Sequence, residues 1–127
     1  MNKNITLILP IYKNIELTMQ CLKSLFANTH YPFHLIIIAD ETTIDDIIII
    51  QQQLTLNTLN NFYLVIRSEK EGVISAYNVG MKLSKEDDVV LIQNDVEFPK
   101  LEGKCWLERL MMKSWETDVG LVGCKNS

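Results

Sequence analysis

The sequence predicts an α/β fold with a mainly parallel sheet and helices on both faces. Two observations predict it: short β-branched apolar runs alternate with helical patterns, and several of these runs are apolar at every position. Strands that alternate with helices are joined by right-handed crossovers, which place helices over both faces of a sheet. A chain of 127 residues suits one hydrophobic core, so residues 1–127 are expected to form a single domain.

Five apolar runs are expected to be strands. The first is expected to stop at Pro10, and the last is only the start of a strand. In chain order, the expected strands are residues 5–9, 35–39, 62–66, 89–92 and 119–122.

Three of the helices follow clear sequence signals. Asn14 is a good cap for a helix with an apolar stripe at three- and four-residue spacing, namely Ile15, Met19, Leu22, Leu25 and Phe26. Residues 73–83 form a helix with small residues where it must pack closely, namely Ser75, Ala76 and Gly80. Residues 106–115 carry a stripe expected to be core or an interface rather than a base-stacking platform, namely Trp106, Leu110, Met111 and Trp115.

The segment after Thr43 is ambiguous, because four consecutive isoleucines at residues 47–50 have a high β propensity. Thr43 can cap a helix, and acidic residues follow it in what would be the first turn. A helix is predicted with one apolar face, formed by Ile44, Ile47, Ile48 and Leu54.

The bulk properties exclude some classes of function. A formal charge of −4 argues against a nucleic-acid partner, which normally requires a basic face. No apolar run is long enough to cross a bilayer and no signal peptide is evident, so a cytoplasmic protein is expected, with peripheral membrane attachment left open. The three cysteines (Cys21, Cys105 and Cys124) suit buried thiols in a reducing compartment. His30 and His34 have no metal-ligand partners at suitable spacing and are expected to be structural or surface residues.

Polar side chains gather directly after the expected strands, where ligands bind in parallel α/β sheets. These residues are Tyr12 and Lys13, Asp40 and Glu41, Arg67, Asn94 and Asp95. The contrast with the apolar strands indicates a site, although strand-to-helix loops are commonly polar for other reasons. Tyr12 can stack on a base and Asp40 can accept a hydrogen bond from a base N–H, but packing and helix capping explain such residues equally well.

The first loop lacks the glycine patterns of dinucleotide-binding folds and P-loops. A bound diphosphate would therefore need a divalent cation in place of a glycine-rich cradle. Mg²⁺ binds through one or two carboxylates together with substrate phosphates and water, and Asp95 is the candidate ligand.

Seven segments in this order resemble family 2 glycosyltransferases of the GT-A type. They are residues 8–14 with Pro-x-Tyr, 21–25 with the turn at 30–32, the acid-terminated strand 35–40, 67–80, the Asn-Asp segment 91–99, 106–110 and 119–123. The resemblance implies the Rossmann-like, nucleotide-sugar-binding half of an enzyme that transfers a sugar from a nucleotide diphosphate to a saccharide, lipid-linked or protein acceptor. It also implies Mn²⁺ or Mg²⁺ as cofactor.

The resemblance implies a role for each matching residue. Pro10 and Tyr12 would frame the nucleoside, Asp40 would bind the base edge, and Arg67 and Gly72 would line the nucleotide pocket. Asn94 would lie by the ribose, and Asp95 would hold the metal that bridges the diphosphate.

The sequence also departs from the family pattern. Ala39-Asp40-Glu41-Thr42 stands where Asp-Asp-Gly-Ser is usual, and Gln93 and Asn94 occupy positions that often hold carboxylates. The chain is expected to end before the acceptor-binding half, in which inverting members carry their general base, so the catalytic residue is unknown and Glu97 is not favoured. An inactive transferase-like module that binds a nucleotide or a protein partner is the alternative, and a homodimer through exposed apolar surface is left open.

Overall fold

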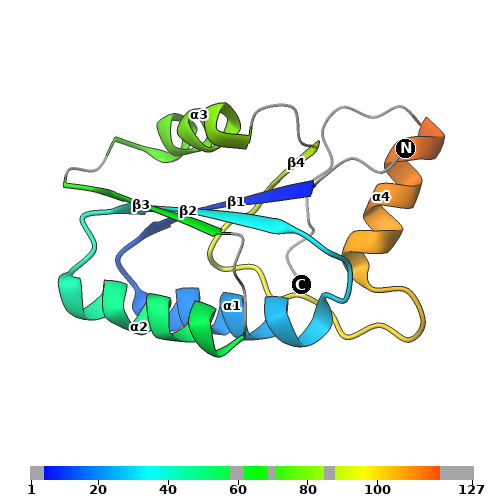
Figure 1. The fold of residues 1–127 in the computed structure, drawn as a ribbon, viewed down its shortest axis with the longest axis horizontal. Helices are drawn as coiled ribbons and strands as arrows, with labels where there is room; N and C mark the ends of the chain where they lie inside the picture. Colours follow the sequence, from blue (N-terminus) through cyan, green and yellow to red (C-terminus); the bar gives the residue numbers. More distant parts are fainter. Residues whose placement is uncertain (1–4, 58–61, 69–70, 85–87, 118–127) are drawn as a thin grey trace.

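The computed structural model describes residues 5–57, 62–68, 71–84 and 88–117, and within them strands and helices alternate (Figure 1). The strands are β1 (Ile5–Tyr12), β2 (His34–Asp40), β3 (Phe62–Arg67) and β4 (Asp88–Leu91). The helices are α1 (Ile15–Asn28), α2 (Ile44–Leu56), α3 (Val73–Ser84) and α4 (Trp106–Thr117). The predicted α/β class is confirmed, because all adjacent strands pair in parallel in the order β3-β2-β1-β4. The expected strand at 119–122 lies outside the described residues.

Helices cover both faces of the sheet, with α1 and α2 below it and α3 above it in Figure 1. On β1, Leu7 and Leu9 belong to the core cluster that includes residues of α1, α2 and α4, whereas Ile8 belongs to the cluster with Ala76 of α3. Alternate residues of one strand thus enter opposite cores. This burial of both faces explains why the central strands are apolar at nearly every position.

The close packing expected of α3 is confirmed at Gly80. A Cβ atom built on Gly80 would lie only 2.5 Å from Cγ2 of Ile8, which is closer than two carbon atoms can approach. Because Gly80 has no side chain, α3 lies directly against β1. Its first residues are thereby held beside the carboxyl ends of the strands.

The isoleucine-rich segment is a helix, as predicted, but its buried face was predicted correctly only at Ile47 and Leu54. Thr43 caps α2 by accepting a hydrogen bond from the backbone N–H of Asp46 at 3.2 Å. The buried residues of α2 are Ile47, Ile50 and Leu54, whereas Ile44 is 78% exposed and Ile48 is 46% exposed. Four consecutive isoleucines point in all directions around a helix, so the packing against the sheet, and not the sequence pattern, selects the buried stripe.

Strand β1 continues through Pro10 instead of stopping at it. The backbone N–H of Ile92 donates to the carbonyl of Ile8 at 2.9 Å, so Ile8 faces β4, and the alternation of the ladder makes Pro10 face the same side. Strand β4 has ended at that level, so the missing N–H of proline interrupts no strand pairing. The hydroxyl of Tyr77 instead donates to the carbonyl of Ile92, at 3.2 Å.

The segment after β4 runs back along α1 to α4. The side chain of Asn28 donates to the carbonyl of Phe98 at 2.9 Å, and the indole N–H of Trp106 donates to the hydroxyl of Thr29 at 2.6 Å. The rings of Phe98 and Trp106 stack with centroids 4.5 Å apart. The expected core role of the α4 stripe is confirmed for Trp106 and Met111, while the side chain of Trp115 lies outside the described part of the chain.

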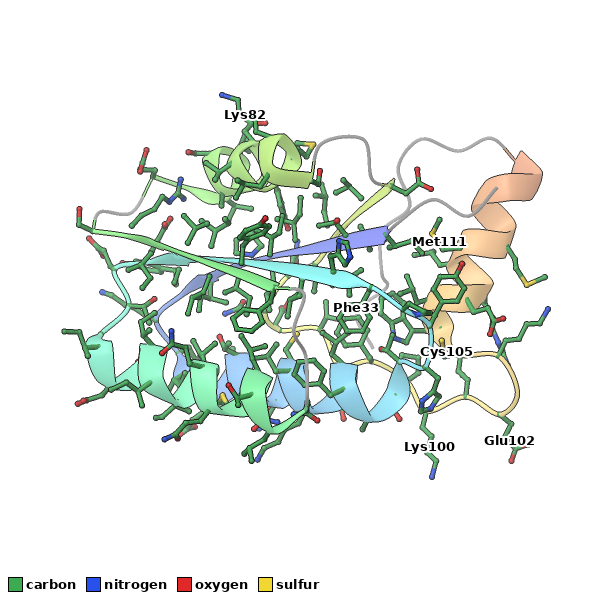
Figure 2. The ribbon with its side chains drawn as sticks, viewed as in Figure 1. Phe33, Lys82, Lys100, Glu102, Cys105 and Met111 are labelled. Atoms are coloured by element: carbon green, nitrogen blue, oxygen red, sulfur yellow. The ribbon has the colours of Figure 1, made fainter. Side chains whose placement is uncertain are left out.

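Sulfur-containing core side chains are buried, and charged side chains lie at the surface. Cys105 and Met111 are buried, whereas the charged side chains of Lys82, Lys100 and Glu102 project outward (Figure 2). Cys21 is also a buried thiol, as predicted, and Cys124 lies outside the described residues. None of the described helices is long and apolar enough to cross a membrane.

Candidate functional site

A pocket of about 240 Å³ lies at the carboxyl ends of the strands. It is lined by Pro10, Ile11, Tyr12, Asp40, Gly72, Val73 and Asn94. The chain passes from β3 across the opposite face through α3 to reach β4 beside β1, so β1 and β4 flank the point where the strand order reverses. Ligands of doubly wound sheets bind at this point.

Five of the six residues predicted to bind a nucleotide line this one pocket: Pro10, Tyr12, Asp40, Gly72 and Asn94. The sixth, Arg67, contacts Asp40 instead of lining the pocket. Asp95, the predicted metal ligand, follows Asn94 directly but is exposed and does not line the pocket.

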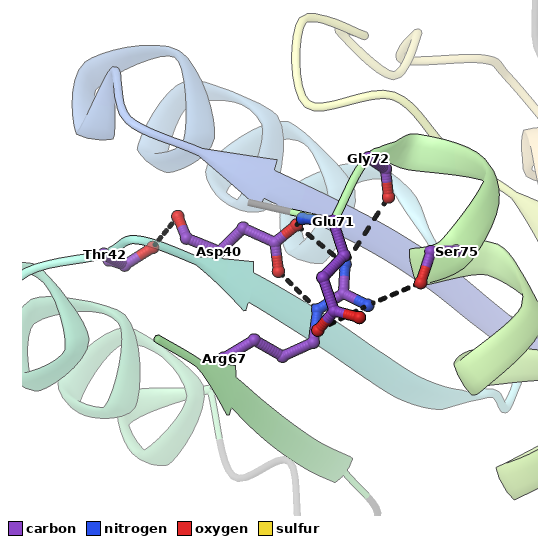
Figure 3. A network of polar contacts seen from close by, with 6 residues as sticks. All are labelled: Asp40, Thr42, Arg67, Glu71, Gly72 and Ser75. Carbon is purple, nitrogen blue, oxygen red and sulfur yellow. Dashed lines mark hydrogen bonds and ion pairs between the residues drawn. The ribbon is translucent and has the colours of Figure 1, made fainter. Parts of the chain in front are cut away.

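The central polar feature of the site is an ion pair between Asp40 and Arg67 that is made through two hydrogen bonds (Figure 3). The Arg67 Nε–H donates to Oδ1 of Asp40 at 2.5 Å, and Nη2 donates to Oδ2 at 2.7 Å. The two side chains are only 6% and 10% exposed, respectively. This parallel arrangement is the strongest geometry for an arginine and a carboxylate, and it fixes the orientation of both.

Further contacts fix the pair to the start of α3. Nη1 of Arg67 donates to the hydroxyl of Ser75 at 2.9 Å, and Nη2 approaches the carbonyl of Gly72 at 3.4 Å. The backbone N–H of Glu71 lies 3.4 Å from Oδ2 of Asp40. The hydrogen bond to Asp40 raises the pKa of Arg67 further above its ordinary value, so this cation is permanent. One guanidinium group thus joins β2, β3 and α3.

Gly72 occupies a position that requires glycine. Its φ angle is +94°, a conformation that residues with a side chain rarely adopt. Its carbonyl accepts a hydrogen bond from the backbone N–H of Ala76 at 3.1 Å, in the first turn of α3. The sharp turn therefore lets α3 begin immediately beside the pocket.

The β1 side of the pocket carries an aromatic ring and a cation. Tyr12 is half-buried at the end of β1, and Nζ of Lys13 lies 5.1 Å from the centroid of its ring. A hydrogen bond with the Tyr12 side chain raises the pKa of Lys13. The ring is thus placed at the pocket with a positive charge next to it.

The β4 side of the pocket is formed by a turn. The backbone N–H of Val96 donates to the carbonyl of Gln93 at 3.2 Å, which places Asn94 and Asp95 at the middle of the turn. Asn94 is half-buried and Asp95 is exposed. Among the described residues, no three His, Cys, Asp or Glu side chains come together as a metal site. A single exposed carboxylate nevertheless fits a cation of the Mg²⁺ type, which takes most of its other ligands from substrate phosphates and water.

The structure adds three residues to those predicted for the site. Ile11 and Val73 line the pocket, and Ser75, which the sequence indicated only as a packing residue, accepts a hydrogen bond from Arg67. Ile11 lies between two predicted residues, and Ser75 lies three residues after Gly72. Their proximity in sequence was the available signal, but their residue types alone pointed to packing. His30 is exposed and His34 is half-buried in β2, and neither belongs to the pocket.

A pocket at the switch point of a parallel α/β sheet is the usual position of a bound ligand in proteins of this fold class. The sequence profile described as Glycosyl transferase family 2 matches residues 6–124, and the chain belongs to this family. No curated protein is matched by the sequence.

Two solved structures show the same fold at low sequence identity. One is the mannosyltransferase PcManGT from Pyrobaculum calidifontis in complex with GDP-Man and Mn²⁺, with 18% identity and a TM-score of 0.68 over 78% of this chain and 29% of that chain. The other is S. aureus TarS 1–349 in complex with UDP, with 18% identity and a TM-score of 0.71 over 91% of this chain and 33% of that chain. The chain therefore spans about a third or less of these structures, and the likeness concerns the fold.

Proposed function

We propose that this chain binds the nucleotide-sugar donor in a glycosyltransferase that transfers the sugar to an acceptor with inversion. The observation that carries the proposal is the pocket at the switch point, in which an acid held by an arginine faces a tyrosine and an asparagine. Membership of glycosyl transferase family 2 supports the reaction class. The GDP-Man and UDP named for the two similar structures support the class of ligand.

We assign each lining residue to one part of the bound nucleotide. Pro10 and Tyr12 frame the nucleoside, and Asp40 accepts a hydrogen bond from the base. Arg67 holds Asp40 in position from behind, through contacts that include the carbonyl of Gly72. Asn94 lies on the opposite side of the pocket and binds the ribose.

Asp95 would hold Mn²⁺ or Mg²⁺ together with the diphosphate of the donor. The bound cation would neutralise negative charge on the leaving diphosphate. The Mn²⁺ named for the PcManGT structure supports the choice of metal. The first loop has no glycine-rich phosphate cradle, which supports the need for a divalent cation at the diphosphate.

No described residue is assigned as the general base or as part of a binding site for the acceptor. Glu97 is exposed and does not line the pocket, so the geometry gives no reason to assign it the proton transfer. A saccharide, a lipid-linked sugar or a protein side chain could each supply the attacking hydroxyl. The proposed location is the cytoplasm.

Thermal unfolding with UDP, GDP and dTDP, each with and without Mn²⁺, tests donor binding. A ligand at 100 times its dissociation constant should stabilise the folded chain by about 2.7 kcal/mol. ATP with Mn²⁺ is a control for a nonspecific effect of the metal–triphosphate complex. If no nucleoside diphosphate shifts the unfolding temperature at millimolar concentration, the proposal is wrong.

An inactive nucleotide-binding module is the second candidate, because Gln93 and Asn94 replace carboxylates that are common at this turn. Such a module would give the same thermal shift without catalysis. Hydrolysis or transfer of a radiolabelled sugar from its nucleotide, measured with the full-length protein, distinguishes the two. Binding without any sugar release favours the module.

A further inference from the structure

We propose that Ser24 and Asn28 of α1 are positioning residues for donor binding. They do not line the pocket themselves, but they hold the segment that carries Asn94 and Asp95. The inference rests on the proposed donor-binding function and concerns how tightly the donor binds when a metal is present. Two hydrogen bonds between α1 and the backbone of Phe98 carry it.

Both backbone polar groups of Phe98 are bound by side chains of α1. The backbone N–H of Phe98 donates to Oγ of Ser24 at 3.0 Å, and the side-chain amide of Asn28 donates to the carbonyl of Phe98 at 2.9 Å. The hydroxyl of Ser24 donates in turn to the carbonyl of Cys21 at 3.0 Å, which leaves its lone pairs for the N–H of Phe98. These bonds fix the main chain of Phe98 and not only its ring.

The side chains of α1 that contact this segment share one face of the helix. Ser24 lies three residues after Cys21 and four before Asn28, which is the spacing of neighbours on a helix surface. The thiol of Cys21 lies 3.9 Å from the carbonyl of Gln93, a weak contact nearer the start of the segment. A stripe of polar side chains on α1 thus follows the segment from Gln93 to Phe98.

The other end of the segment is held by the sheet and by α3. The backbone N–H of Ile92 donates to the carbonyl of Ile8 at 2.9 Å, and the carbonyl of Ile92 accepts from the hydroxyl of Tyr77 at 3.2 Å. A short segment that is anchored at both ends has few conformations left. The main chain of Asp95 is therefore placed between two anchors, Ile92 and Phe98, while its side chain is exposed.

Loss of the anchor at Phe98 would affect one part of the site more than the other. Asp95 would lose its fixed distance from the pocket, and the cost of ordering the segment would offset part of the metal-dependent binding energy. Asp40 belongs to β2 and is held by Arg67 of β3, so its position does not depend on this anchor. Metal-dependent binding should weaken, whereas binding without metal should not.

Isothermal titration with UDP, GDP and dTDP, each with Mn²⁺ and with EDTA in its place, tests this for Ser24→Ala and Asn28→Ala. The affinity measured with Mn²⁺ should fall about tenfold in each variant, as is typical when a residue that orients a metal ligand is removed. The affinity measured with EDTA should stay unchanged. Because these hydrogen bonds also stabilise the fold, the decisive result is the metal dependence and not the stability.

The possible results of the titration separate the two proposals. Equal losses with Mn²⁺ and with EDTA, or no loss in either, would overturn the positioning role. Wild-type binding that is the same with Mn²⁺ and with EDTA would also overturn it and leave the proposed donor binding intact. If the wild-type protein binds none of the three nucleotides, the proposed function itself fails.

The matched control is Ser84→Ala in α3. The hydroxyl of Ser84 donates to the carbonyl of Met81 at 2.8 Å, as that of Ser24 donates to Cys21, but among the described residues only Ser24 also accepts a loop N–H. Ser84→Ala should therefore keep the full effect of Mn²⁺. Ser24→Thr keeps the hydroxyl and should restore what Ser24→Ala loses, and a folded Ser24→Thr that behaves like Ser24→Ala contradicts the mechanism.

Amide hydrogen exchange of the wild-type protein tests the anchor without any substitution. The N–H of Phe98 is bound to Ser24, whereas Asp95 lies at the exposed middle of its turn. The amide of Phe98 should exchange at least about tenfold more slowly than that of Asp95. Equal exchange at the two positions would overturn the inference even if neither alanine variant folds.

Discussion

Two acidic residues of the pocket region, Asp40 at the end of β2 and Asp95 in the turn after β4, are held in opposite ways. The side chain of Asp40 is 6% exposed and accepts three hydrogen bonds from Arg67 and the backbone of Glu71. Asp95 is exposed, and its side chain makes no hydrogen bond or ion pair with the other described residues. The Asp40 side chain is therefore fixed in the absence of ligand, whereas the Asp95 side chain is exposed to solvent.

This difference indicates how a donor would bind. The Asp40 side is preorganised, so a base would meet a rigid acceptor and lose little in ordering the protein. The Asp95 side would become ordered only when a diphosphate brings a cation to it. Base recognition and metal binding are therefore expected to respond differently to mutation, and three substitutions test this.

The largest effect on stability is expected from Arg67→Ala. Removing the guanidinium leaves the nearly buried Asp40 carboxylate without a cation, which should lower the free energy of unfolding by about 3 kcal/mol. Urea denaturation followed by circular dichroism measures this loss. Lys82→Ala removes an exposed cation from α3 and should stay within about 0.5 kcal/mol of wild type. A loss below about 1 kcal/mol for Arg67→Ala would mean that the Asp40 side is not preorganised.

An intermediate effect is expected from Tyr77→Phe, which removes a contact to Ile92, directly before the Asp95 turn. The Tyr77 hydroxyl is the donor to the carbonyl of Ile92, and its removal should cost about 1 kcal/mol near pH 8. Burial raises the pKa of Tyr77 above its ordinary value. The folded state therefore holds this proton more tightly than the unfolded state, so the stability that it contributes is present below about pH 10 and is lost as the pH rises through the folded-state pKa.

Thermal unfolding of wild type and Tyr77→Phe at pH 8 and pH 11 measures this pH dependence. The stability difference between the two proteins should shrink at the higher pH. A difference that grows with pH would show that the tyrosine is not held in its protonated form.

The smallest effect on stability is expected from Asp95→Ala. Because the side chain is exposed and has no described partner, the free energy of unfolding should change by less than about 0.5 kcal/mol. The Mn²⁺-dependent part of the UDP-induced thermal shift should disappear, while the metal-independent part remains. Glu97→Ala, at another exposed acid in the same segment, is the control and should keep the full metal response. An unchanged response in Asp95→Ala would rule out Asp95 as the ligand.

Much of the fold could be predicted from local patterns in the sequence. Continuous apolar runs such as 35–39 identify strands buried on both faces, and Asn14 and Thr43 mark helix starts because their side chains bond to the first turn. Most of the pocket followed from one rule, that ligands bind at the carboxyl ends of parallel strands. That rule brought Tyr12, Asp40 and Asn94 together correctly.

The errors arose where tertiary contacts decide the outcome. The buried face of α2 depends on its contact with the sheet, and Ile44 to Ile50 contain too many isoleucines for a pattern to reveal it. The place of Arg67 behind Asp40 follows from the pairing of β2 with β3, in which these two residues lie directly opposite. No local signal in the sequence carries that cross-strand register.

Pro10 has a consequence for the open end of the sheet. Beyond Ile8, the final residues of β1 overhang β4, and such an unpaired flank could recruit a foreign peptide as an added strand. Proline offers that peptide no donor, and the facing carbonyl of Ile92 is capped by Tyr77. The overhang is thereby protected from β-augmentation, and the space above it stays accessible to a small molecule.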